Sequence, residues 1–302
     1  MITEKRKKLL ELLEPKEKQI EKFCQNYRGP GLLKKIKRLL KYRRKYLKFY
    51  LSRLTSTPLK VKTFWGEDFW PLETVTLYLF GLLGDYQKTR LNKFLIKNLP
   101  ENTVFYDIGA NSGFYSILVE NIIENKEIHA FEPVPATFRY LKKNFFFYSN
   151  IFLNQIAIFN KEDEIDFYDA TKTGYPGISS FDNSFINNIF HSKLKKIKVK
   201  TTTLDKYCSF HSLPTFIKID VEGAESHVIE GGIKTLKKTN PIIAMEVFNN
   251  NSSHLKAIEI LYRLGYESYK INQDGELIFI EKLFPEREIS KEDRFDNFIF
   301  KK

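Results

Sequence analysis

Four short apolar runs of this chain end in, or carry, an acidic side chain. Asp107 follows Val104–Tyr106, Glu132 ends the run from Ile128, Asp220 follows Phe216–Ile219, and Glu246 lies near the end of Ile242–Val247. Runs of this kind are typical of strands buried in a parallel sheet. Because ligands of open α/β sheets bind outside the carboxyl ends of the strands, we expect the four carboxylates to line one cleft. There they could accept hydrogen bonds from a cofactor or take a proton from a substrate.

The turn after the first run is rich in small residues and precedes a helical pattern. Gly109 and Gly113 would let the chain turn sharply and leave no Cβ where a ligand lies against backbone. A helix that opens near 112–114 would offer unpaired N–H groups. The dinucleotide pattern G-x-G-x-x-G is absent, because Asn111 stands between the two glycines. The alternative is an ordinary βαβ unit whose glycines serve only the turn.

Glu132 comes nineteen residues after Gly113, at the end of the second predicted strand. At this place in nucleotide-binding sheets a carboxylate accepts hydrogen bonds from both ribose hydroxyls of an adenosine. The pattern therefore favours a nucleoside-containing cofactor. The alternative is a solvated acid at a strand end.

The motifs resemble a known family in their order and spacing. The runs DIGANSGFYS, AFEPVPATFRYLKKN, TTLDKY and IKIDVEGAESHVIEGG look like the FkbM family of S-adenosylmethionine-dependent methyltransferases, over about residues 65–302. The resemblance implies an α/β class I methyltransferase (Rossmann-like) fold, a seven-stranded sheet with helices on both faces. It also implies S-adenosylmethionine as cofactor and a hydroxyl of a sugar, glycan or natural product as methyl acceptor.

The resemblance and the residues together give a candidate site. The expected cofactor-binding residues are Asp107, Gly109, Asn111, Gly113, Phe114, Glu132 and, in the element after the third strand where such enzymes hold adenine, Ala157. Asp220 and Glu222 are the first candidates for the catalytic base, and Glu246 is another. His227 titrates in the useful range but falls outside the motif. The same acids could bind Mg²⁺, yet no His-rich ligand set accompanies them, and we predict no metal.

Two further stretches could contact an acceptor. Ser179 and Ser180 belong to a Ser-rich element that the family often carries, although a plain surface loop is the alternative. Trp65, Phe69 and Trp70 could stack on a sugar, although aromatic residues dominate ordinary packing as well.

The positive charge is concentrated at the N-terminus. Residues 1–62 hold 20 Lys or Arg and 5 Asp or Glu, whereas the whole chain has a net charge of +12. We therefore divide the chain into a basic helical extension, 1–62, and a methyltransferase domain, 63–302. Within the extension, residues 32–54 predict a basic amphipathic helix that could lie on an anionic membrane surface, bind nucleic acid or dock on an acidic partner. Alternatively, its apolar stripe packs on the catalytic domain.

The expected location is the cytoplasm, with attachment to a membrane surface as an option. The N-terminus has no apolar core of signal-peptide length, no run is long enough to span a membrane, and Cys24 and Cys208 are too few for a disulfide framework. Other functions stay open: an RNA methyltransferase that uses the basic segment, a nicotinamide-dependent dehydrogenase, or a non-catalytic binding module.

Coarse strand boundaries complete the expectation. The predicted strands are 104–106, 128–131, 151–158, 216–219, 242–247, 267–271 and 276–280, and Asn272–Gly275 indicates a hairpin between the last two.

Overall fold

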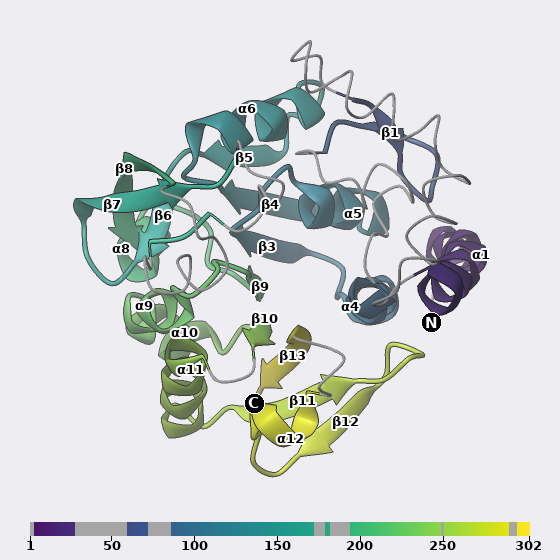
Figure 1. Cartoon of the computed structure of the whole chain (residues 1–302). Coiled ribbons are helices and arrows are strands. Elements are labelled where there is room, and N and C mark those ends of the chain that lie inside the picture. The colour runs from purple at the N-terminus through teal and green to yellow at the C-terminus, as the bar shows by residue number, and fades with distance from the viewer. Residues whose placement is uncertain are drawn as a thin grey trace.

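A computed structural model describes residues 3–27, 59–71, 86–171, 179–181, 194–248, 251–289 and 295–302. Its centre is a mixed sheet of eight strands in the order β12-β11-β13-β10-β9-β3-β4-β5 (Figure 1). The strands are β12 (Leu277–Ile280), β11 (Glu267–Ile271), β13 (Phe295–Lys301), β10 (Ile242–Phe248), β9 (Phe216–Ile219), β3 (Thr103–Ile108), β4 (Lys126–Phe131) and β5 (Ile151–Asn154). The five strands from β10 to β5 run parallel.

This arrangement confirms the predicted α/β class, with one strand more than the expected seven. The hairpin of β11 and β12 forms as predicted. The sequence reasoning missed β13, which pairs antiparallel with both β10 and β11 and so separates them. This C-terminal strand buries Phe298 and Phe300 completely, because it lies inside the sheet rather than at an edge.

Helices cover both faces of the sheet, as expected (Figure 1). One face packs against α4 (Tyr86–Asn98) and α5 (Phe114–Ile122), and α6 (Pro135–Asn144) adjoins α5. The opposite face packs against α8 (Leu204–Cys208), α9 (Glu225–Glu230), α10 (Ile233–Thr239) and α11 (Ser252–Arg263). A short helix, α12 (Pro285–Glu288), precedes β13. Aromatic side chains fill the first face, where the rings of Phe105 and Phe216 stack 5.6 Å apart.

The connections change direction between β3 and β9. From β3 the chain passes through α5 to β4 on one side, whereas from β9 it passes through α9 and α10 to β10 on the other side and the other face. Such a switch point opens a crevice outside the carboxyl ends of the two strands. The loops that follow Ile108 and Ile219 are therefore neighbours.

Two smaller sheets flank the main one. β6 (Ala157–Phe159), β8 (Lys195–Thr203) and β7 (Asp163–Asp169) form a three-stranded sheet in that order, and β1 (Val61–Lys62) pairs with β2 (Asp68–Phe69). The prediction of a single strand over 151–158 is wrong, because this stretch forms two strands, β5 and β6, in different sheets. The chain leaves the main sheet after Asn154 and enters the three-stranded sheet at Ala157, so the apolar run serves two sheets.

The first helix, α1 (Glu4–Tyr27), packs on the sheet domain. Leu9 and Leu13 are buried in the core beside α4, and Arg6 donates a hydrogen bond to the backbone oxygen of Leu99 at 2.6 Å. Glu17 pairs with Lys93 at 2.6 Å. The expected boundary at residue 62 falls at the end of β1, and the basic segment 32–54 lies outside the described residues. Among the described helices, none has the length and apolar character needed to cross a membrane.

Candidate active site

The turn after β3 is held by backbone contacts and by three left-handed residues. Gly109, Asn111 and Gly113 have φ values of +83°, +53° and +91°. The N–H groups of Gly109 and Ala110 both donate to the carbonyl of Phe131, at 3.0 and 2.9 Å. The turn is thereby fastened to the end of β4, next to Glu132.

The glycines serve a purpose other than the one predicted. A Cβ on Gly109 would lie 1.9 Å from the backbone oxygen of Asp220, and a Cβ on Gly113 would lie 2.2 Å from Cε2 of Phe145. The missing side chains thus let the protein approach itself: the β3 turn meets the β9 turn, and α5 meets the end of α6. The sequence predicted that the missing Cβ atoms of Gly109 and Gly113 leave room for a ligand. In the structure, other parts of the protein occupy the space at both positions.

Asp107 is buried at the end of β3 and caps the start of α5. The backbone N–H and the hydroxyl of Ser116 donate to its Oδ2 at 3.1 and 2.7 Å. Its Oδ1 has no hydrogen-bond partner among the described residues. Burial raises the pKa of this carboxyl, and the nearby Lys218 ammonium acts in the opposite direction. One carboxylate oxygen therefore holds the start of α5, and the other is buried without a hydrogen-bond partner among the described residues.

Glu132 bridges the turn and the beginning of α6. Its Oε2 accepts from the N–H of Asn111 at 3.1 Å, and its Oε1 accepts from the N–H of Val134 at 2.8 Å. Burial raises its pKa to about 8, although both backbone donors lower it. The two oxygens hold further lone pairs, so the side chain can fix the turn and still accept from a ligand.

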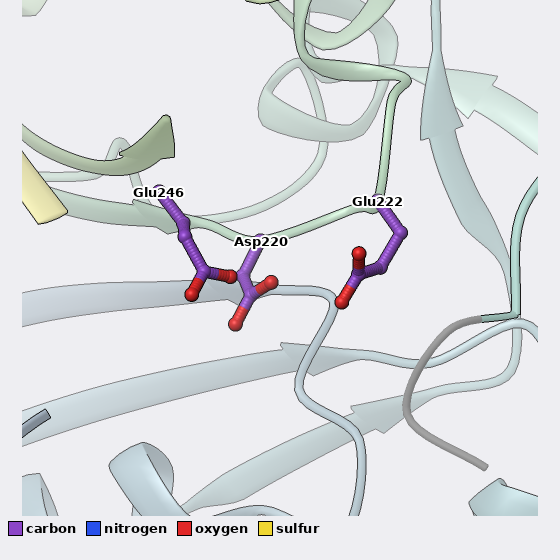
Figure 2. A group of neighbouring side chains, drawn as sticks. All are labelled: Asp220, Glu222 and Glu246. Atoms are coloured by element: carbon purple, nitrogen blue, oxygen red, sulfur yellow. The ribbon is translucent and has the colours of Figure 1, made fainter. Parts of the chain in front are cut away.

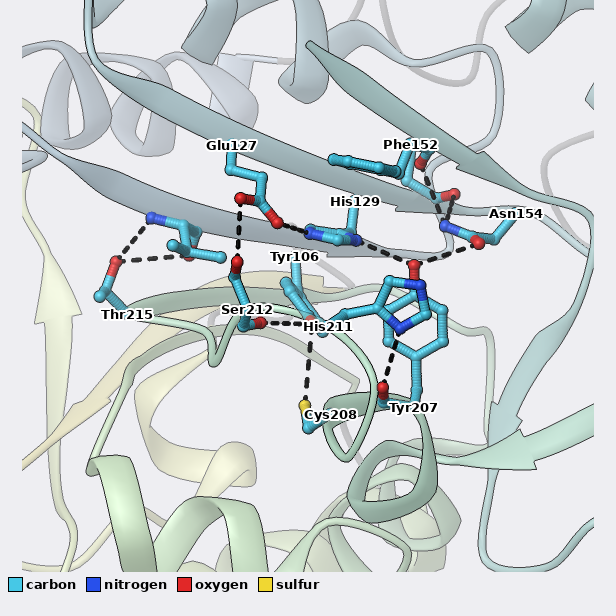
Figure 3. Close-up of polar contacts among 12 residues, drawn as sticks. Tyr106, Glu127, His129, Phe152, Asn154, Tyr207, Cys208, His211, Ser212 and Thr215 are labelled. Carbon is cyan, nitrogen blue, oxygen red and sulfur yellow. Dashed lines mark hydrogen bonds and ion pairs between the residues drawn. The ribbon is translucent and has the colours of Figure 1, made fainter.

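A polar network on the α8 face fixes the end of β5 (Figure 3). His129, buried within β4, has Nε2 2.6 Å from Oε1 of Glu127 and Nδ1 2.8 Å from the hydroxyl of Tyr207. Burial lowers the pKa of His129, and the Glu127 carboxylate opposes this effect. Tyr207 in turn donates to Oδ1 of Asn154 at 3.2 Å, and the carbonyl of Asn154 accepts from the N–H of Glu132 at 3.0 Å. The network thus supports the ends of β4 and β5, next to the turn that follows β3.

Next to these strand ends is an open cavity of about 470 Å³. It is lined by the start of α6, the residue after β5 and one end of the three-stranded sheet, namely Pro135, Ala136, Arg139, Gln155, Asp169, Thr171, Lys195 and Ile197. The predicted residues Phe114 and Ala157 lie elsewhere. The ring of Phe114 stacks on Trp65 at 6.1 Å, and Ala157 is half-buried in β6.

The three acids predicted for catalysis come together. Asp220 follows β9, Glu222 sits in the same loop with φ +53°, and Glu246 is buried in β10. One carboxylate oxygen of each lies within 4.8 Å of the others, and Figure 2 shows the three groups turned toward one another. This spacing would also suit a cation.

A lysine that sequence reasoning overlooked lies beside the acids. Nζ of Lys218 is 3.0 Å from Oδ2 of Asp220, with the lysine almost completely buried, and it lies 4.7 Å from the ring centroid of Tyr115. Residues two apart in a strand share one face, so the spacing Lys-Ile-Asp was a usable signal. The buried ammonium partly balances the negative charge of this edge.

A second buried pair anchors the loop that carries Asp220 and Glu222. Oε2 of Glu225 lies 2.7 Å from Nε2 of His254, and both side chains are buried. Nδ1 of His254 accepts from the N–H of Phe248 at 2.6 Å, while Oε1 of Glu225 accepts from the N–H of Gly223 at 3.2 Å. The pair therefore ties the loop after β9 to the end of β10, which holds Glu246.

The remaining candidates have structural contacts. The hydroxyl of Ser180, completely buried, donates to the backbone oxygen of Glu222 at 2.6 Å, and Oγ of Ser179 accepts from the N–H of Ala170 at 3.0 Å. His227 stacks on Phe159 with ring centroids 4.3 Å apart, and burial lowers its pKa. Ser180 thus holds the loop of Glu222 through its hydrogen bond, and His227 packs on the three-stranded sheet.

Comparison with known proteins gives one family. A model of the methyltransferase FkbM domain matches residues 107–268. A 2-O-methyltransferase, NoeI, of Sinorhizobium fredii (strain NBRC 101917 / NGR234) is 30% identical over 145 residues, which make up 45% of this chain and 60% of that protein. The chain thus matches less than two thirds of this relative's length.

Solved structures are similar at low sequence identity. A methyltransferase FkbM from Methylobacillus flagellatus KT has a TM-score of 0.44 and 15% identity, over 76% of this chain and 53% of that one. Fibrillarin of Aeropyrum pernix, solved with natively bound S-adenosyl-L-methionine, has a TM-score of 0.40 and 14% identity, over 70% of this chain and 74% of that one.

Proposed function

The chain belongs to the FkbM methyltransferase family, and we propose that it is a methyltransferase that moves a methyl group from S-adenosylmethionine to a hydroxyl of a sugar, glycan or other small molecule. The observation that carries this proposal is the meeting of Asp220, Glu222 and Glu246 within 4.8 Å. They meet where the β9 turn touches Gly109. Carboxylates suit both a cationic cofactor and an acceptor that must lose a proton. The 2-O-methyltransferase relative favours a hydroxyl as acceptor.

The residues around the β3 turn fit S-adenosylmethionine. Glu132 would accept from the ribose hydroxyls, and Oδ1 of Asp107, which lacks a partner among the described residues, would accept from a donor of the methionine part. The cavity that Gln155 lines would take the adenine. When bound, the cofactor supplies an electrophilic methyl group on a positively charged sulfur. The acidic strand ends favour that charge.

The acids after β9 and in β10 have two different roles toward the acceptor, orientation and removal of its proton. Lys218 holds Asp220 through its 3.0 Å ion pair, so Asp220 orients the site. Glu222 or Glu246 takes the proton of the acceptor hydroxyl. Holding two reactants in near-attack geometry can lower a barrier by about 7–11 kcal/mol, so positioning is the larger contribution.

The proposal is tested with methyl-labelled S-adenosylmethionine and a panel of sugars and oligosaccharides, with products read by mass spectrometry. We expect label on a hydroxyl oxygen and none on an otherwise identical acceptor that lacks that hydroxyl. Glu222→Gln and Glu246→Gln identify the base, because only the base variant should lose turnover while keeping cofactor affinity. Label on nitrogen or carbon, or turnover with neither glutamate, would contradict the assignment.

An RNA acceptor is the competing substrate, and it rests on the basic residues 32–54 rather than on the site. Including RNA in the panel separates the two. Methylation of RNA that falls steeply with added salt, because phosphate contacts release counterions, would replace the small-molecule proposal.

A further inference from the structure

The loop between α6 and β5 exposes two adjacent aromatic rings. Phe146 is 79% exposed and Phe147 is 92% exposed, and their ring centroids lie 5.0 Å apart. The neighbours on both sides are fixed. Phe145 is buried against Gly113, and the N–H of Tyr148 donates to the carbonyl of Phe145 at 3.1 Å. The two rings therefore project from a turn of defined shape.

Lysines surround this turn. α6 ends in Lys142 and Lys143, both exposed, and Nζ of Lys143 lies 4.5 Å from the ring centroid of the half-buried Trp70. In the part of the chain that the structure describes, neither lysine forms an ion pair. No acidic residue occurs in the sequence between Glu132 and Glu162. We call the set Trp70, Lys142, Lys143, Phe146 and Phe147 the aromatic-lysine surface.

The chain adds further positive charge beside this surface. Lys60 Nζ lies 5.8 Å from the ring centroid of Trp70, although Asp68 pairs with it at 2.7 Å. The preceding residues, 28–58, contain 11 Lys or Arg and no Asp or Glu. In the sequence, this basic segment leads directly to Leu59 and to Lys60, which lies over Trp70.

We propose that the aromatic-lysine surface binds an anionic membrane surface. Exposed phenyl and indole rings insert at the boundary of headgroups and acyl chains, and lysines beside them attract anionic lipids. An acidic protein would use the lysines without two exposed phenyl rings. RNA bases stack on aromatic faces, but the rings of Phe146 and Phe147 stand at 88° to each other and form no shared stacking face.

The surface is mechanically connected to the cofactor turn. The Nδ2 group of Asn144 donates to the carbonyl of Trp70 at 2.9 Å and to that of Ser112 at 2.8 Å, and its Oδ1 accepts from the N–H of Trp70 at 2.8 Å. Membrane attachment at this surface would hold the catalytic domain in a fixed orientation. This effect on orientation does not depend on which acceptor is methylated.

The test is co-sedimentation of the full chain with vesicles of phosphatidylcholine, with and without phosphatidylserine. We expect binding only with phosphatidylserine, weakened by salt. The double variant F146S/F147S should reduce the partition coefficient by at least about tenfold, since burial of one phenyl ring alone can supply a factor of that size. K142E/K143E should act similarly. Unchanged circular dichroism and thermal midpoint would show that the variants fold.

Phe210→Ser is the matched control. Phe210 lies on the loop before β9 and is 74% exposed, and its ring centroid is 5.2 Å from Nζ of Lys206. It should leave partition unchanged. Equal binding by F146S/F147S and the unaltered chain would overturn the proposal, as would an equal loss in Phe210→Ser. Two other results would also overturn it: a dimer in solution that F146S/F147S dissociates, or RNA binding that depends on these residues without vesicle binding.

Discussion

Nζ of Lys218 lies 3.0 Å from Oδ2 of Asp220, and both groups belong to the β9 edge of the candidate site. The same ammonium also acts on the buried Asp107, whose pKa is raised by burial and lowered by Lys218. One lysine therefore supports two carboxylates on neighbouring strands.

Replacing Lys218 with Met should destabilise the protein strongly. The substitution leaves the Asp220 carboxylate without its buried cation, which costs about 3 kcal/mol of the free energy of unfolding. Urea denaturation of both proteins measures this loss in the free energy of unfolding. Lys196→Met is the control, since Lys196 pairs with Asp166 in an exposed ion pair, and its loss should lower the free energy of unfolding much less. Equal costs would contradict the account of Lys218.

Gly109→Ala should be much more harmful than Gly66→Ala. Both glycines have positive φ, +83° and +101°, so alanine is strained at each by about 1–2 kcal/mol. Only at Gly109 does the new Cβ meet backbone, at 1.9 Å from the Asp220 oxygen, whereas nothing lies within 4 Å at Gly66. Thermal unfolding of both variants checks this. A similar midpoint for the two would show that the β3 and β9 turns are less tightly apposed.

Cofactor affinity should depend on the ionisation of Glu132. Burial raises its pKa to about 8, and accepting from two ribose hydroxyls requires the carboxylate. Below pH 8, binding must therefore release a proton, and the Kd should rise by up to about tenfold for each unit of falling pH. Calorimetry in buffers of different ionisation enthalpy measures the released proton. Glu132→Gln should bind weakly with no such proton release; a wild-type Kd that is independent of pH would refute this role.

Breaking the pair of Glu225 and His254 should impair turnover more than cofactor binding. The pair joins the loop of Asp220 and Glu222 to the end of β10, and it is remote in the sequence from the β3 turn. His254→Ala should cost about 2 kcal/mol of stability and lower kcat, with little change in the cofactor Kd. Leu255→Ala, at an exposed position of the same helix, serves as the control. A loss of affinity as large as the loss of kcat would argue against a positioning role.

Chelation should leave methyl transfer intact. Although the oxygens of Asp220, Glu222 and Glu246 are spaced as cation ligands could be, Lys218 already supplies a positive charge to Asp220. Methyl transfer is measured before and after dialysis against EDTA, and we expect the same rate in both. Loss of activity that Mg²⁺ restores would make the acids a metal site.

The sequence predicted the strand ends well because their signal is local. Short apolar runs ending in acids located β3, β4, β9 and β10, and the parallel arrangement then brought Asp220 and Glu246 together without further information. The same reasoning missed β13, since its place between β10 and β11 depends on pairing with distant strands. It also misread the glycines, because the neighbour of Gly109 is a carbonyl more than a hundred residues away. The single strand predicted over 151–158 was wrong for a related reason: the chain changes sheets between Asn154 and Ala157.

A calorimetric titration of the full chain with S-adenosylmethionine, and separately with NAD, measures whether the crevice between β3 and β9 binds the methyl donor. We expect binding of one equivalent of S-adenosylmethionine, no binding of NAD, and a marked loss of affinity in Asp107→Asn, whose fold is verified by circular dichroism. Absence of S-adenosylmethionine binding by the folded wild-type chain, or unchanged affinity in Asp107→Asn, would contradict the placement of the cofactor at the crevice between β3 and β9.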